Sequence, residues 1–188
     1  MKTKAQLADK FSGPSSLLYQ SGALTITESD GEKSFTVTPE LDVPCKVDSL
    51  NFEQGEAEVE EYKVIGLSGA WITDSEPGDI DLGFRVPSIS EDILKLAFGT
   101  DAVSDITAAV DGVDYEGLAV ILKNKKVQGT WLIVNSAKDR IMVINNTALF
   151  ASLVLDSDAK GVIAVDFNGS IETDGTNPDV IFLKKKTS

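Results

Sequence analysis

The sequence contains no histidine, only one cysteine and no long run of apolar residues. Without histidine the chain lacks the commonest general base and one of the two usual zinc-binding side chains. Cys45 can form no intramolecular disulfide, and we interpret it as a small, partly buried apolar residue. No apolar run reaches the roughly 18 residues that a membrane span needs, and the first residues lack the apolar region of a signal peptide. We therefore expect a protein made in the cytoplasm, without a membrane partner.

Positive charge is also scarce. The chain has 17 basic and 30 acidic residues, which gives a net charge of −13. Tight binding of nucleic acid depends on neutralising phosphates, so we expect no sequence-specific nucleic-acid binding. The same charge would suit a surface that nucleic acid passes without sticking, although ordinary solubility explains it equally well.

Three motifs could carry chemistry, and each has a plainer interpretation. Asp79 and Asp81 could hold a cation or act as an acid and base, but alternation in a strand already places polar residues there. Residues 156–161 begin like a calcium loop, yet Lys160 and Phe167 occupy ligand positions, which favours a tight turn. Residues 145–147 match a glycosylation triplet and are interpreted as a strand entrance or turn. We therefore expect no catalytic, metal-binding or cofactor-binding residues, and no enzyme.

The pattern of apolar residues predicts a mainly β protein. Residues 1–22 are polar and are interpreted as an amino-terminal arm, residues 23–183 as one β domain, and residues 184–188 as a basic tail. The strongest strand signal is residues 80–86, where every second residue is apolar. Strands or hairpins are predicted at residues 23–37, 45–54 with a bulge near Leu50, 56–65, 70–73, 80–86, 117–123, 127–135, 140–155, 161–171 and around 182–183.

Helical signals are few. Ser90 is placed to cap a helix over residues 91–98, with Gly99 as its stop. Residues 100–115 fit either a second short helix or an irregular loop, and for residues 56–65 a helix competes with the strand. Trp71 and Trp131 lie in apolar strand contexts and are expected in the core. The chain is therefore predicted to be a β sandwich or barrel of two packed sheets with one or two short flanking helices.

The order of elements from residue 47 to residue 99 resembles the major tail tube proteins of tailed phages. The segments that carry the resemblance are Gly69-Ala70-Trp71-Ile72, Glu76-Pro77-Gly78-Asp79, Leu82-Gly83-Phe84-Arg85-Val86-Pro87 and Ser90-Glu91-Asp92-Ile93-Leu94. The resemblance implies a β sandwich with a flanking helix, and hexameric rings that stack into a hollow tube with an acidic lumen for DNA passage. It also implies arms or hairpins that join rings, other tail proteins as partners, and a location in the virion tail or in the bacterial cytoplasm during assembly.

Association with copies of the same chain is expected to use the amino-terminal arm, residues 1–22, and charged segments outside the core. The candidate residues are an acidic group and a basic turn, in which the acidic group of one subunit could meet the basic turn of another. These residues are Glu53, Glu56, Glu58, Glu60, Glu61, Lys123, Lys125 and Lys126. The alternative function is a β-sandwich adhesion or ligand-binding module, which exposed aromatic residues gathered on one face would favour.

Overall fold

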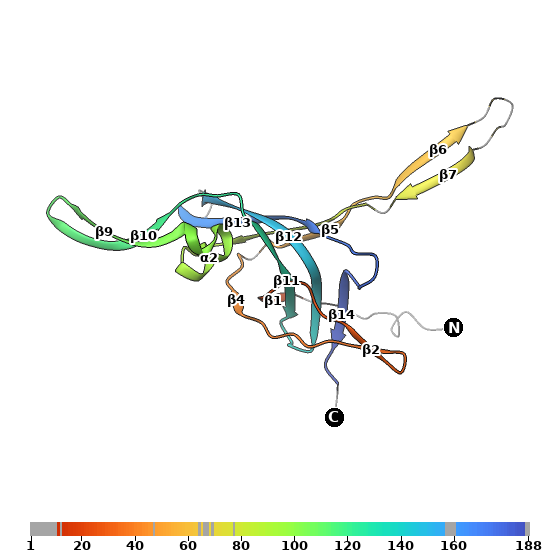
Figure 1. Ribbon diagram of the computed structural model, residues 1–188, viewed down its shortest axis with the longest axis horizontal. Coiled ribbons are helices and arrows are strands. Elements are labelled where there is room, and N and C mark those ends of the chain that lie inside the picture. The colour runs from red at the N-terminus through yellow and green to blue at the C-terminus, as the bar shows by residue number, and fades with distance from the viewer. Residues whose placement is uncertain are drawn as a thin grey trace.

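An antiparallel sheet of eight strands forms the body of the protein (Figure 1). The computed structural model describes residues 11, 13–46, 48–63, 65, 68, 70–76, 78–156 and 161–186. The predicted fold class is confirmed, because these described residues are mainly β, with packed sheets and one short α-helix among them. The strands of the main sheet are, in spatial order, β4 (Leu41–Val43), β1 (Pro14–Ser21), β11 (Lys126–Asn135), β12 (Arg140–Asp156), β13 (Val162–Ile171), β8 (Ile80–Val86) and β5 (Asn51–Gln54), with β14 (Val180–Lys184) paired to β12.

Aromatic side chains fill the centre of the main core. The Trp131 ring is completely buried, and its centroid lies 4.8 Å from that of Tyr19 and 4.7 Å from that of Phe84. Phe84 in turn stacks on Phe167 at 5.1 Å. These rings come from β1 and β11 on one side of β12 and from β13 and β8 on its other side, so aromatic packing joins strands that are not adjacent in the sheet. The expectation that Trp131 lies in the core is confirmed, whereas the side chain of Trp71 lies outside the described part of the structure.

Helix α2 (Glu91–Phe98) packs its apolar face into the same core and begins and ends at the predicted residues. Ser90 occupies the capping position, although its side chain makes no capping hydrogen bond. Gly99 ends the helix with a φ of 107°, a conformation that side chains disfavour, and its N–H donates to the Lys95 carbonyl at 2.9 Å. A single turn of 3₁₀ helix, η1 (Thr100–Ala102), follows.

A bulge divides the long strand β12 into two parts. Gly129 of β11 pairs with Thr147 and Trp131 pairs with Ile144, so Asn145 and Asn146 together stand opposite one residue of β11. Before the bulge β12 pairs with β14 on its other side, and after it β12 pairs with β13. The bulge also shifts the strand by one position, so the even-numbered Ile144 and the odd-numbered Leu149 both reach the main core.

A second, smaller core lies on the outer face of the sheet. Leu24, Leu132 and Val143 are buried there, and partly buried residues between 26 and 37 pack around them. This segment includes the predicted hairpin, β2 (Thr27–Ser29) and β3 (Glu32–Ser34). Its two-residue turn, Asp30-Gly31, has positive φ angles of 54° and 77°, the conformation that Asp-Gly favours between antiparallel strands.

Two hairpins project from opposite ends of the body (Figure 1). One is formed by β6 (Glu58–Lys63) and β7 (Ala70–Glu76), and the other by β9 (Val103–Val110) and β10 (Val113–Val120). In both cases the two strands pair with each other and with no other described strand. The strand predicted over residues 56–65 is thus present as β6, and the region left open at residues 100–115 is mostly strand.

Two sequence expectations about the first third of the chain are wrong. Residues 14–21 do not belong to an arm: β1 is an inner strand, paired with β11 on one side and β4 on the other, and it buries Leu17 and Tyr19. Residues 1–10 lie outside the described residues. The strand predicted from Cys45 begins only at Asn51, because the described residues before it form a loop held by side-chain hydrogen bonds.

Candidate assembly surface

The β9–β10 hairpin, called the β9–β10 ribbon below, has two chemically different faces. Eight consecutive residue pairs join its strands, from Val103 with Val120 to Val110 with Val113. Its turn is Asp111-Gly112, with φ angles of 51° and 79°. Because side chains alternate between the faces of a strand, this register sorts the residues into two sets. One set is apolar apart from Ser104 and comprises Ser104, Ile106, Ala108, Val110, Val113, Tyr115, Gly117 and Ala119; the other contains Asp105, Thr107, Ala109, Asp114 and Glu116 beyond an apolar base.

The apolar face of the ribbon is open to solvent. Ile106, Val110, Val113 and Tyr115 each expose between 50 and 55% of their surface. Large apolar side chains exposed together over a whole ribbon are unusual in a monomer, and a two-stranded ribbon with no covering layer is at best marginally stable in water. The apolar face of the ribbon is therefore a candidate contact surface.

The base of the ribbon packs on its own body through the opposite face. Val103 is buried in the main core, and Leu118 and Val120 pack against it. These three residues share the face that carries Asp105, Asp114 and Glu116 farther out. The apolar face is consequently directed away from the core of the same chain.

A second apolar surface lies where β12 and β13 extend past the core. Leu153, Leu155 and Ile163 expose 42, 69 and 44% of their surface, and Leu155 pairs directly with Ile163. They continue the face on which Leu149 is completely buried. We call these three residues the β12–β13 end; on the opposite face of the same strands, Phe150 and Val162 are also exposed.

The three lysines of the predicted basic turn contact acidic or carbonyl groups of their own chain. The Lys123 ammonium donates to the Asp101 carboxylate at 2.6 Å, and this contact lowers the pKa of Asp101. Lys125 donates to the carbonyl oxygens of Lys95 and Leu96 at the end of helix α2, and Lys126 pairs with Glu172. The prediction that these lysines meet an acidic surface of another subunit must compete with these contacts.

The predicted acidic residues lie along the path from β5 to the β6–β7 hairpin. Glu53 is in β5 and pairs with Asp81 of β8, while Glu56 lies in the connection to β6. Glu58, Glu60 and Glu61 are in β6, where the register pairs Glu60 with Asp74. The structure therefore places the acidic set in one extended region, far along the sheet from the ribbon (Figure 1). Its part in assembly stays a prediction.

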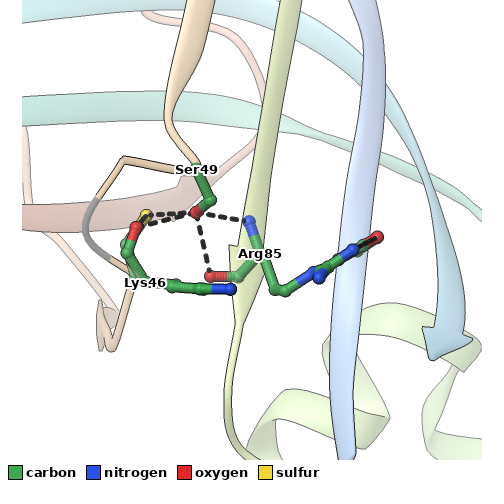
Figure 2. A network of polar contacts seen from close by, with 5 residues as sticks. Lys46, Ser49 and Arg85 are labelled. Carbon is green, nitrogen blue, oxygen red and sulfur yellow. Dashed lines mark hydrogen bonds and ion pairs between the residues drawn. The ribbon is translucent and has the colours of Figure 1, made fainter. Parts of the chain in front are cut away.

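An open groove of about 710 Å³ beside β8 is the best candidate for the alternative, a ligand-binding function. Figure 2 shows the polar network at its edge. The Ser49 hydroxyl donates to the Lys46 carbonyl at 2.7 Å and accepts from the Arg85 N–H at 3.0 Å. The Arg85 guanidinium donates to both Asp166 carboxylate oxygens, at 2.6 and 2.7 Å. These groups form hydrogen bonds with one another and hold residues 46–49 against β8. The polar groups beside the groove therefore have a structural role.

The other predicted positions show no assembled chemistry among the residues that the structure describes. No group of three or more histidine, cysteine, aspartate or glutamate residues is placed to hold a metal ion there. Burial raises the pKa of the Cys45 thiol, against a smaller lowering effect of its contact with Ser49, which fits the expected partly buried residue. Most of the calcium-like segment at residues 156–161 lies outside the described residues.

The position of Asn145 corrects one expectation, and the helices bear on another. Asn145, expected at a strand entrance or turn, is 4% exposed and lies in the bulge inside β12. Within the described parts of the chain, no helix has the length and apolar character required to cross a membrane.

No protein-family model matches the sequence, and no curated protein matches it significantly.

The ribbon is the candidate surface that sequence reasoning left unassigned. Its signal was present: Ile106, Ala108 and Val110 alternate with polar or small residues, Asp111-Gly112 is a hairpin turn, and Val113 and Tyr115 resume the alternation. The β12–β13 end could not be found in this way, because a sequence does not show where the strands of a sheet extend beyond the residues that cover them.

Proposed function

We propose that this protein is a structural, non-catalytic subunit that assembles with copies of itself, in the manner of a phage tail tube protein. The observation that carries the proposal is the apolar face of the β9–β10 ribbon, which is exposed along its length and directed away from its own core. Burying such a face in a contact between subunits gives a large hydrophobic stabilisation.

The architecture supports a closed or stacked assembly, such as the hexameric rings that the resemblance implies. The two hairpins reach outward in opposite directions, so each subunit can contact more than one neighbour (Figure 1). The acidic face of the ribbon must stay in contact with water. In a hollow tube it would suit the wall of the passage, where negative charge repels DNA.

The ligand-binding alternative has less support. It predicts exposed aromatic residues gathered on one face, but four of the aromatic rings, Tyr19, Phe84, Trp131 and Phe167, pack together in the core. Of the aromatic side chains exposed in the described structure, Tyr115, Phe150 and Phe182 come from different elements.

Negative-stain electron microscopy of concentrated protein tests the proposal, together with sedimentation velocity over a hundredfold range of protein concentration. Rings or tubes, and sedimentation that increases with concentration, are the expected results. A folded protein that sediments as a monomer throughout and forms no particles would overturn the proposed function.

A further inference from the structure

We infer that copies of this chain associate head to tail, with the apolar face of the β9–β10 ribbon of one copy packing against the β12–β13 end of the next. This inference rests on the proposed function and specifies the contact through which assembly occurs. Its starting point is that one chain carries two separate apolar surfaces, and that neither covers the other. In the single chain, Ile106 and Tyr115 on the ribbon expose 50 and 55% of their surface, and Leu155 on the β12–β13 end exposes 69%.

The two surfaces match in form. The ribbon face is two strands wide, and with eight residues per strand it is about 26 Å long at about 3.3 Å per residue. The β12–β13 end is also a pair of antiparallel strands. Two such pairs can pack face to face at the usual separation of sheets, about 10 Å, with their side chains interdigitated.

The two surfaces also match in charge. The residues of the β12–β13 end and those that share their face, Ala151 and Val165, carry no charge, and the register places Asp156 with Val162 among the residues of the other face. The apolar face of the ribbon carries no charge either, and its aspartates and glutamate lie on the opposite face. Packing the two surfaces together would therefore bury no charge and would bring no like charge close to the acidic face.

A second copy is the occupant that covers both surfaces with one kind of contact. If two ribbons packed on each other, the β12–β13 ends of both copies would stay exposed. In a head-to-tail contact, every inner copy of a ring or row covers one neighbour's surface and is covered by another. A contact between two different patches can repeat, which is what a closed ring requires.

A pair of complementary variants tests the inference. The ribbon variant is Ile106→Lys with Tyr115→Lys, and the end variant is Leu155→Lys; all three side chains are exposed, so the fold should persist. The matched controls place the same charges on the other faces: Thr107→Lys with Ala109→Lys on the ribbon, and Ser152→Lys on β12. Circular dichroism and thermal melting establish that each variant is folded.

Each variant alone should associate at least about tenfold more weakly than the parent, whereas both controls should associate like the parent. An equimolar mixture of the two variants should form one-to-one dimers and nothing larger. In that dimer the intact ribbon of the end variant docks on the intact end of the ribbon variant, and the other two surfaces are blocked. Sedimentation velocity, with one variant carrying a fluorescent label, measures the size and composition.

The remaining outcomes separate the inference from the proposed function. An end variant that associates as well as the parent would show that ribbons do not dock on the β12–β13 end, and a mixture of folded variants that stays monomeric would also overturn the inference. In both cases the proposed function survives if the parent still assembles. A parent that never associates would overturn both.

Discussion

The side-chain oxygen of Asn145 accepts a hydrogen bond from the backbone N–H of Leu24 at 2.8 Å. The same oxygen accepts from the Thr130 hydroxyl at 3.3 Å, and the amide nitrogen donates to the Pro178 carbonyl at 3.3 Å. Asn145 therefore joins three segments that are far apart in the sequence. It ties the outer layer, which begins near Leu24, to the point where β12 changes its neighbouring strand.

Replacing Asn145 with leucine should destabilise the protein by about 1–3 kcal/mol. The substitution keeps the size of the side chain but leaves the buried Leu24 N–H without its acceptor. Urea unfolding followed by tryptophan fluorescence measures the change. Asn124→Leu, at an exposed loop position, is the control and should change stability by less than about 0.5 kcal/mol. Equal effects of the two substitutions would contradict the role assigned to Asn145.

Gly169→Ala should destabilise the protein by about 1–3 kcal/mol. Gly117→Ala should leave its stability nearly unchanged. A Cβ atom at residue 169 would lie 2.1 Å from the Ala148 carbonyl oxygen and 2.9 Å from the Leu149 Cα, so the backbone of β12 would have to move. At residue 117, on the ribbon, nothing lies within 4 Å of the same atom. Thermal denaturation of both variants tests the difference, and a similar melting temperature for the two would show that β12 and β13 do not approach so closely.

Cys45 should react slowly with iodoacetamide, with a midpoint of its pH profile above the ordinary value for cysteine. Burial raises the pKa of the thiol, so less of the reactive thiolate is present at pH 8 than in an unfolded chain. Mass spectrometry of the alkylated protein, from about pH 7 to about pH 10, gives the profile. The protein unfolded in urea is the reference; a native profile that coincides with it would contradict the burial of Cys45.

Lys125→Met should lower stability by about 0.5–1 kcal/mol, because Lys125 donates to two carbonyl groups at the end of helix α2. Lys123→Met should leave the unfolding midpoint unchanged within error, since the side chain of its partner Asp101 is 75% exposed. Chemical denaturation compares the two variants. If Lys125→Met instead changed only the salt dependence of association, the earlier prediction of an intersubunit role would be the better one.

The sequence predicted best the elements whose pattern depends on one covered face. Strand β8 was predicted over its observed range because Leu82, Phe84 and Val86 reach the core while the residues between them do not. Helix α2 was predicted because its apolar spacing, Ser90 and Gly99 all indicate the same boundaries.

Strand β1 was missed for a physical reason. Leu17 and Tyr19 pack in the main core, and Leu18 packs in the second core on the other face. Because both faces of β1 are covered at this point, three apolar residues follow one another and the alternation disappears. The contacts of Lys123, Lys125 and Lys126 were beyond sequence reasoning, since each partner lies at least 22 residues away in the chain.

The bulge at Asn145 and Asn146 sets how the chain can tolerate insertions and deletions. Removing one of the two asparagines would restore uninterrupted alternation, so every later residue of β12 would move to the opposite face of the sheet. Leu149, now completely buried, would become exposed, and the exposed Phe150 would face the core. Length changes at the turn of the β9–β10 ribbon would disturb no buried neighbour. Among homologous chains, gaps in an alignment should therefore gather at residues 111–112 and be missing from the middle of β12.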